Sequence, residues 1–351
     1  DREGPVIVRD ILGRQPLFVE AAALDTETEA NPTAPGAWGF ARSALDEPEP
    51  VPAGSVVSAA GTERVWRLPD AGPTADREAA LATVEDAVSA ALDDLSNGSA
   101  GSAGAGDLAV AFSGGVDSGL VAAAVPEAPC YVAGFEGSHD IAAAHEAASA
   151  MDRDLRVVEV THDDLTRAVR AVAAATGRRN PMDASIAVPL FMTAEAAAAD
   201  GFDRLAVGQG ADELFGGYSK VVDPAEDSRV DADTVRGART ETVRTLPDQL
   251  ERDVLALRAA GVEPATPLLD DRVVGAALAL PDALLVDGDE RKVALRRAAE
   301  FLPAEIRSRD KKAVQYGSLL AREFDRLARQ AGFKKRMDDH LGRYVESLRP
   351  E

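Results

Sequence analysis

Short apolar runs alternate with longer segments of helical periodicity over the middle of this chain. Four of these runs predict strands, at about residues 107–112, 130–134, 155–160 and 204–208. The segments between them predict helices, one ending at Val125 before Pro126, one beginning near Asp140, and two over about 162–176 and 189–200. Short strands separated by helices indicate an α/β domain whose parallel sheet is covered on both faces.

The two flanks of this region differ from it. Stretches with period-two alternation, interrupted by Pro and Gly, predict a small β-rich unit at residues 1–72, with strands within 4–10, 15–22, 53–61 and 63–69. A predicted helix over 75–95 and a Gly- and Ser-rich link over 97–106 follow. Beyond about residue 236 the pattern is mostly helical, at 248–260, 270–280, 290–301 and 318–347. We therefore expect a second domain over 73–351 with a helical C-terminal part.

Composition narrows the class of protein. The net charge is −22, from 60 Asp and Glu residues against 38 Lys and Arg. This excess disfavours a nucleic-acid partner, because phosphate backbones are bound by clustered Lys and Arg, and it is typical of proteins from salt-loving microbes. No apolar run approaches the ~20 residues of a membrane-spanning helix. With no recognisable leader either, we expect a soluble, cytoplasmic protein without a membrane partner.

Residues that commonly form disulfides or bind metals are sparse. Cys130 is the only cysteine, which excludes an internal disulfide and a structural cysteine–zinc site. It falls inside a predicted strand, where a buried and inert thiol is expected. The histidines lack metal-ligand spacing, at His139, His145, His162 and His340.

A glycine turn joins the first predicted strand of the α/β region to its helix. This turn, SGGVDS at residues 113–118, would lie beyond the carboxyl end of the strand, where open parallel sheets bind ligands. Its two glycines let the backbone approach an anion, and the following helix begins with unpaired N–H groups and a partial positive charge. The turn fits neither the Walker pattern nor the dinucleotide pattern GxGxxG. It is therefore a candidate phosphate cradle of another type.

A second glycine-rich segment, VGQGADELFGGY at residues 207–218, follows the fourth predicted strand. On its own this segment is typical of a capped helix start. Paired with the first turn, it would bring Asp117 and Asp212 to neighbouring strand ends. Mg2+ in nucleotide sites commonly takes one or two carboxylates together with phosphate oxygens and water. The two aspartates therefore predict a site for Mg-ATP.

These two segments resemble the hallmarks of a known family. The SGGVDS turn is similar to the pyrophosphate-binding loop of the PP-loop ATP pyrophosphatases, and together with the second segment it resembles the synthetase domain of the asparagine synthase family. Further segments resemble that family in its order, at 136–140, 261–270, 292–296 and 309–312. Ala265 stands where the family has Arg. The resemblance covers roughly residues 75–320 and implies a PP-loop α/β fold.

The resemblance also implies roles for individual residues. Pyrophosphate and Mg2+ would be held by Ser113, Gly114, Gly115, Asp117 and Ser118, with Asp212 as the second metal ligand. The adenosine pocket would be lined by Ala111, Ala133, Val207 and Gly208. Lys311 would neutralise charge on the α phosphate and the leaving pyrophosphate, as a mobile point charge can. The other candidate catalytic residues are Gln209 and Glu213.

The activity implied by the resemblance is an ATP-dependent amidation that forms AMP and pyrophosphate. Its ligands would be ATP, Mg2+, ammonia, and aspartate or a similar carboxylate, which attacks the α phosphate to give an acyl adenylate. One departure is Gln209, because the family usually has Glu there and Gln cannot act as a base. Either another group, such as Glu213, Glu263 or Asp183, takes the proton, or the acceptor differs, as in the β-lactam synthetases. A nucleotide-binding regulator without turnover is a third interpretation.

The N-terminal unit carries a resemblance of its own. Residues 8–18 resemble a segment from the later half of the glutaminase domain that feeds ammonia to this family, and residues 52–57 resemble a turn near the end of that domain. Glutamine hydrolysis there needs an N-terminal nucleophilic Cys, which this sequence does not contain. We therefore expect a truncated or degenerate glutaminase remnant, with ammonia that is free or comes from a separate glutaminase. The resemblance also allows a homodimer.

Overall fold

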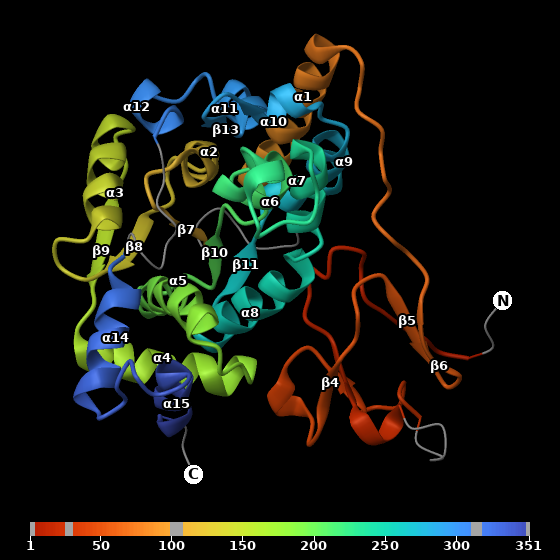
Figure 1. Cartoon of the computed structure of the whole chain (residues 1–351), viewed down its shortest axis with the longest axis vertical. Coiled ribbons are helices and arrows are strands. Elements are labelled where there is room, and N and C mark those ends of the chain that lie inside the picture. Colours follow the sequence, from red (N-terminus) through yellow and green to blue (C-terminus); the bar gives the residue numbers. More distant parts are fainter. Residues whose placement is uncertain (1–3, 25–30, 99–107, 310–317, 349–351) are drawn as a thin grey trace.

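The computed structural model describes residues 4–24, 31–98, 108–309 and 318–348, and a five-stranded parallel sheet lies at its centre (Figure 1). The strands are β7 (Leu108–Ala111), β8 (Cys130–Gly134), β9 (Leu155–Glu159), β10 (Arg204–Ala206) and β11 (Glu263–Ala265). Their spatial order is β11-β10-β7-β8-β9. The sheet confirms the expected parallel α/β fold. The edge strand β11 was not predicted, because Glu-Pro-Ala lacks the apolar, β-branched character of a strand, and only an edge tolerates its proline.

Helices cover both faces of this sheet (Figure 1). They are α1 (Arg77–Ser96), α2 (Val116–Ala124), α3 (His139–Ala150), α4 (His162–Thr176), α5 (Pro181–Ala199), α6 (Ala211–Phe215), α7 (Val235–Val243), α8 (Leu246–Ala259), α9 (Asp271–Leu278), α10 (Asp282–Leu285), α11 (Val293–Ala298), α12 (Ala304–Arg307), α14 (Leu320–Gln330) and α15 (His340–Ser347). A short hairpin, β12 (Val286–Asp287) and β13 (Glu290–Arg291), precedes α11. The helix predicted over 290–301 is therefore shorter than expected, because its first residues pair in this hairpin.

The direction of winding changes between β7 and β10. From β7 the chain proceeds to β8 and β9 on one side, and it then returns to place β10 on the other side of β7. Arg204 pairs with Leu108 and Ala206 with Val110, in parallel register. The carboxyl ends of β7 and β10 therefore lie side by side. Open α/β sheets bind ligands at such a switch point, and both glycine-rich segments begin here.

Alternate residues of the strands pack on opposite faces of the sheet. Leu108 and Val110 belong to the largest hydrophobic cluster, which includes residues of α1, α2 and α3. Ala109 and Leu205 point the other way and pack with residues of α5 and α8. Burial on both faces is the reason that these strands are continuous apolar runs in the sequence. Cys130 is free and buried in the first cluster, as expected, and burial raises the pKa of its thiol.

Helix α5 is longer than predicted. It begins at Pro181, where the side chain of Asn180 accepts a hydrogen bond from the backbone N–H of Met182, and it continues through Pro189. The start expected at residue 189 was wrong because a proline more often opens a helix than lies inside one. Among the described residues, α5 is the one helix whose length and composition would suffice to cross a membrane. More than half of it is buried in this fold, where it packs against β8, α4 and α8.

The C-terminal segment, predicted to be helical over 318–347, forms two helices. Helices α14 and α15 pack on each other, with the rings of Phe324 and Tyr344 5.4 Å apart, and their apolar residues join a cluster with α4 and α5. The apolar residues of α14 and α15 therefore serve packing of the fold.

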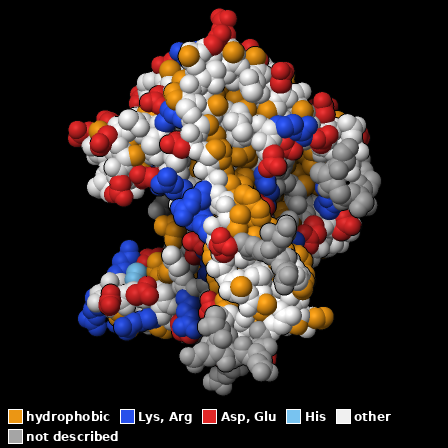
Figure 2. All heavy atoms as spheres, turned by 90° about the vertical axis from the view of Figure 1, so that its right-hand side faces the viewer, with side chains coloured by type: hydrophobic (Ala, Val, Ile, Leu, Met, Phe, Trp, Pro, Cys, Tyr) orange, Lys and Arg blue, Asp and Glu red, His pale blue; other side chains and the backbone are white. Residues whose placement is uncertain are grey.

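The N-terminal region contains two small antiparallel sheets. Their strands are β1 (Ile7–Val8), β5 (Ser55–Ser58) and β6 (Gly61–Arg64) in one sheet, and β3 (Trp38–Gly39), β2 (Phe18–Glu20) and β4 (Pro48–Pro50) in the other. The region is β-rich as predicted, although the last strand ends at Arg64, before the expected Val65–Pro69 portion. Figure 2 faces the side of the molecule that carries this region, where hydrophobic side chains are interspersed with charged ones.

This region is anchored to the α/β part by buried and charged side chains. Leu12 is fully buried in the main hydrophobic cluster. The Nε of Arg14 donates a hydrogen bond to the carbonyl oxygen of Leu269 at 2.9 Å. Arg9, also buried, donates to the carbonyl oxygen of Pro247 at the start of α8 and lies 3.5 Å from the carboxylate of Glu251. The first turn of α8 is thus in direct contact with the N-terminal region.

Candidate active site

The glycine turn after β7 folds back onto the first turn of α2. The backbone N–H of Ser113 donates to the hydroxyl of Ser118 at 3.2 Å, and that hydroxyl lies 3.3 Å from the carbonyl oxygen of Gly115. Gly114 has a φ of +73°, and a Cβ there would lie 2.4 Å from the backbone oxygen of Ala143. Only glycine fits this position. The turn therefore leaves the N-terminus of a nine-residue helix at the sheet edge, where its N–H groups favour an anion.

The segment after β10 packs directly against this turn. A Cβ on Gly208 would lie 2.9 Å from the Cβ of Asp117, so the two loops approach each other too closely for a side chain. Gly210 has a φ of +89° and precedes α6, and a Cβ there would overlap the side chain of Leu269. Gly208 thus allows close contact between the two loops, which brings their acidic residues together, while Gly114 and Gly210 allow close packing of the loops on their surroundings.

Lys292 joins the two aspartates that the sequence predicted as metal ligands. Its Nζ lies 2.8 and 2.7 Å from the two carboxylate oxygens of Asp117, and 2.6 Å from Oδ1 of Asp212. The expectation that these carboxylates converge from neighbouring strand ends is therefore confirmed in its geometry. Lys292 caps α11 in a left-handed conformation, with a φ of +59°, which directs it into this site.

Gly217 makes room for this contact. A Cβ at this position would lie 2.0 Å from Oδ1 of Asp212 and 2.4 Å from Cε of Lys292. Its carbonyl oxygen accepts a hydrogen bond of 2.6 Å from Arg291, the residue before the lysine. The GGY end of the second segment therefore fixes the distance between the lysine and the aspartate.

Burial and charge perturb three side chains around the aspartates. Burial alone would lower the pKa of Lys292, but the carboxylates of Asp117 and Asp212 outweigh it and hold the pKa above its ordinary value. Burial, and then the charge of Asp212, raise the pKa of Glu213 to about 7. Tyr218 donates a hydrogen bond to Glu213, and burial raises the pKa of this phenol as well. Lys292 is therefore a permanent cation, whereas Glu213 titrates near neutrality.

Mg2+ fits the donor set of this site. Asp117 and Asp212 converge on a single cationic atom, and a nucleotide-bound Mg2+ commonly needs only one or two protein carboxylates. Within the described ranges, no cluster of three or more His, Cys, Asp or Glu residues could hold a metal by itself. Phosphate oxygens and water would therefore have to complete the coordination.

The residues expected around adenosine lie at the same edge of the sheet. Ala111, Ala133 and Val207 are at or just beyond the carboxyl ends of β7, β8 and β10. The side chains of Ala133 and Val207 are buried in hydrophobic clusters. Ala133 and Val207 could therefore offer a ligand only their backbone groups. Lys311 lies outside the described residues.

Two of the three candidate substitutes for a base are engaged elsewhere. Glu263 lies at the amino end of β11, whereas the glycine turns lie at the carboxyl ends of the strands, and it pairs with Arg258 at 2.9 Å. Asp183 pairs with Arg252 at 3.0 Å and with Arg178 at 3.3 Å. Of the three, only Glu213 adjoins the paired aspartates.

Gln209 has a partner that the sequence did not reveal. Its Nε2 donates to Oδ2 of Asp253 on α8 at 3.3 Å, and its Oε1 is shielded from solvent with no hydrogen-bond partner among the described residues. Sequence reasoning also missed Lys292 as a site residue, although it begins the recognised segment 292–296. Lysine at a helix start carries no local signal for a partner 175 residues away.

The five-stranded parallel sheet and the two glycine loops form an α/β domain consistent with the PP-loop type. The asparagine synthase family model matches residues 103–236 and 225–349, so the chain belongs to the asparagine synthase family.

Three named relatives are similar to this chain. A protein of Methanocaldococcus jannaschii named "Putative asparagine synthetase (glutamine-hydrolyzing) 1" is 28% identical over 67% of this chain and 50% of its own length. Asparagine synthetase B of Escherichia coli is 24% identical over 59% of this chain and 41% of its own length. An asparagine synthetase of Brassica oleracea is 26% identical over 59% and 39%, respectively. The chain thus spans half or less of the length of each of these relatives.

Proposed function

We propose that this chain catalyses an ATP-dependent, AMP- and pyrophosphate-forming amidation of a carboxylate, with aspartate as the first candidate substrate. The observation that carries the proposal is the convergence of Asp117, Asp212 and Lys292 beside the glycine turn at the switch point of the sheet. A triphosphate needs backbone N–H groups, a cation and metal-binding carboxylates in one place, and these three are adjacent here. The named relatives, all asparagine synthetases, support the same chemistry.

The first step would form an acyl adenylate. An oxygen of the substrate carboxylate attacks the α phosphorus, and the bond to the oxygen that bridges the α and β phosphates breaks with release of pyrophosphate. The N-terminus of α2 and the hydroxyls of Ser113 and Ser118 hold the leaving group, and Lys292 balances its charge. Mg2+ bound by the two aspartates would supply further charge neutralisation and alignment of the phosphates. We assign Lys311 to the α phosphate on the family resemblance.

The second step would form the amide. The lone pair of a nitrogen nucleophile attacks the acyl carbon, and the carbon–oxygen bond to AMP breaks. The surplus proton passes to the leaving phosphate, to water, or to a side chain with a pKa near neutrality. Glu213 meets this last requirement with a pKa of about 7, although the hydrogen bond from Tyr218 and its burial restrict access to it.

A second candidate is an amide-forming synthetase that acts on a different carboxylate or amine. The observation that favours it is the amide of Gln209 at the position where a basic carboxylate is usual in the family, since an amide cannot accept the proton of an ammonium intermediate. An amine nucleophile of lower basicity would need less help from a base.

Exchange of radiolabelled pyrophosphate into ATP tests the proposal, because it reports the first step without a nitrogen donor. The protein should exchange label in the presence of Mg2+ and aspartate, and Asp117→Asn should lower the rate by at least about 100-fold. Asp86→Asn, an exposed change on α1, is the control and should retain the rate. Exchange with another acid alone would select the second candidate. Nucleotide binding without any exchange would replace both with a regulator.

A further inference from the structure

The amide of Gln209 is held in one orientation by a carboxylate. Asp253 lies on α8, and its Oδ2 is 3.3 Å from the Nε2 of Gln209. A carboxylate has only hydrogen-bond acceptors, so the amide must present its N–H side to Asp253. The carbonyl oxygen of the same amide is therefore turned away from Asp253.

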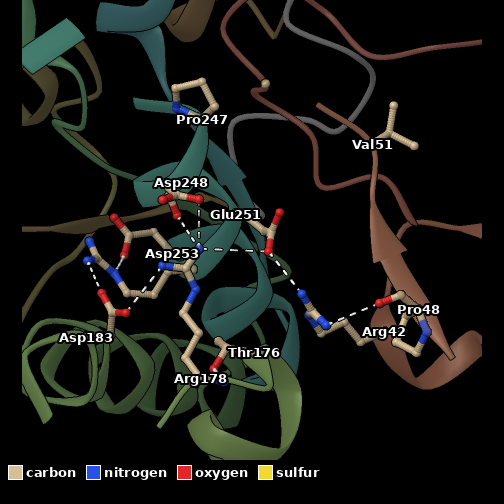
Figure 3. A network of polar contacts seen from close by, with 12 residues as sticks. Arg42, Pro48, Val51, Thr176, Arg178, Asp183, Pro247, Asp248, Glu251 and Asp253 are labelled. Atoms are coloured by element: carbon tan, nitrogen blue, oxygen red, sulfur yellow. Dashed lines mark hydrogen bonds and ion pairs between the residues drawn. The ribbon is translucent and has the colours of Figure 1, made fainter. Parts of the chain in front are cut away.

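Asp253 is itself fixed by charged neighbours. Its Oδ1 accepts a hydrogen bond of 2.7 Å from Arg252, and Arg252 reaches the carboxylate of Asp183 at 3.0 Å. All three groups are largely buried, with Asp253 and Arg252 side chains only 7% and 6% exposed. Figure 3 shows Asp253 and Asp183 near Arg178, which pairs with both Asp183 and Glu251. Glu251 pairs in turn with Arg42 of the N-terminal region. Paired, buried and branched contacts of this kind leave a carboxylate little freedom.

The remaining polar atom of Gln209 is an acceptor that no donor reaches within the described part of the chain. Its Oε1 is inaccessible to solvent and has no hydrogen-bond partner among the described residues. A buried acceptor without a partner costs free energy and calls for a functional explanation. Gln209 lies between Gly208, which contacts the phosphate turn, and Asp212, so this acceptor belongs to the same loop as the proposed reaction centre.

We propose that Asp253 is a positioning residue that orients Gln209 so that its amide oxygen, once substrate binding has uncovered it, accepts an N–H of the attacking nitrogen. This inference rests on the proposed amidation. Acceptance of one N–H orients the nitrogen lone pair toward the acyl carbon without transfer of a proton to the glutamine. The ligand class is thus a neutral ammonia or amine, and the proton lost after attack goes to the leaving phosphate or to water.

Asp253→Ala tests this role through the separation of the two steps. The variant should raise the KM for ammonia, supplied as an ammonium salt, by at least about tenfold, because the amide can then turn its N–H side toward the nitrogen. Its pyrophosphate exchange should stay within about twofold of the wild type, since that step involves no nitrogen nucleophile. In Asp253→Asn the amide oxygen stays with Arg252 and the NH2 group faces Gln209, so the amide of Gln209 should turn and the KM should rise as in Asp253→Ala.

Glu251→Ala is the matched control for loss of structure. It removes a buried carboxylate from the same helix and the same ion-pair network, but Glu251 does not contact Gln209. It should lower stability and leave the KM for ammonia unchanged. An equal rise of this KM in Glu251→Ala would show that Asp253→Ala acts through loosening of α8, and the positioning role would be rejected.

Reversal of the hydrogen bond provides an independent measurement. Gln209→Glu alone would place two carboxylates about 3.3 Å apart and should disturb the nitrogen step. The double variant Gln209→Glu with Asp253→Asn restores a donor opposite an acceptor, so its kcat/KM for ammonia should exceed that of Gln209→Glu by at least about tenfold. Simple additivity of the two changes would overturn the inference. Absence of exchange in the wild type would instead overturn the proposed function, and this inference with it.

Discussion

Replacement of Lys292 by methionine should destabilise the protein by an amount that the structure allows us to bound. Methionine keeps most of the side-chain volume and removes the charge that neutralises two carboxylates. The Asp117 side chain is 7% exposed, so it would become a buried charge without a cation, whereas Asp212 at 37% can still reach water. Breaking a buried ion pair from one side costs about 3–5 kcal/mol, and the exposure of Asp212 places the expected loss near ~3 kcal/mol.

Urea denaturation monitored by circular dichroism measures this loss. The penalty should persist at about 1 M salt, because buried charges are screened far less than exposed ones. Lys334→Met, an exposed lysine in the C-terminal segment, is the control and should change the free energy of unfolding by less than about 0.5 kcal/mol. Mg2+ should stabilise Lys292→Met more than the wild type, because the metal can occupy the vacated position between the carboxylates.

A double variant identifies the source of the effect. If the loss comes from an uncompensated carboxylate, then Asp117→Asn with Lys292→Met should recover part of it, since no buried charge remains without a partner. Equal stability of Lys292→Met and the wild type would refute the reasoning. So would a double variant whose loss equals the sum of the single losses.

Two further predictions concern the same loop. The pKa of Glu213 in the folded protein is about 7, above its ordinary 4.5, so the contribution of this group to the free energy of unfolding is complete below pH 4.5 and is lost as the pH rises to 7. The stability of Glu213→Gln relative to the wild type should therefore increase by about 3 kcal/mol between pH 4.5 and pH 7 and stay constant at higher pH. Urea titrations at several pH values would measure this difference. A pH-independent difference would contradict this. Gly217→Ala should abolish pyrophosphate exchange and lower the free energy of unfolding by about 1–3 kcal/mol, because the added Cβ would overlap Asp212 and Lys292. A Gly217→Ala variant that exchanges pyrophosphate, with Asp212 and Lys292 unmoved in its crystal structure, would contradict this close approach.

The parts of the molecule that the sequence predicted well are those fixed by local patterns. Strand β7 and its glycine turn are contiguous, so one stretch of sequence predicts both the buried apolar strand and the start of the following helix. Asp117 and Asp212 could be paired in advance because parallel strands end at a common edge. Strand β11 was missed because the neighbouring strand β10, and not its own composition, determines its conformation.

The partners of the site residues were not predictable in the same way. Lys292 and Asp253 belong to segments whose sequence is that of ordinary charged helices. Their contacts with the site form only because α11 and α8 pack beside the sheet. A charged residue on a helix is usually solvated, and nothing local distinguishes one that is buried against a distant carboxylate or amide. The resemblance to the family supplied the order of the segments, but not these contacts.

The ammonium group of Lys292 and the amide of Gln209 have different partners at the two ends of one short segment. Residues 208–212 lead from the end of β10 into the first turn of α6, with Gly208 against the phosphate turn, Gln209 on Asp253 and Asp212 on Lys292. In the proposed reaction, Lys292 would face the charge of the phosphates, and the amide that Asp253 anchors would face the neutral nitrogen. If these two environments were swapped, both steps would be disfavoured. An anion near the phosphates would oppose adenylate formation, and a cation near the amine could not accept a hydrogen bond from the N–H of the amine. Close packing explains why glycine occurs at positions 208 and 210 of this segment, since a Cβ at position 208 would overlap Asp117 and a Cβ at position 210 would overlap Leu269.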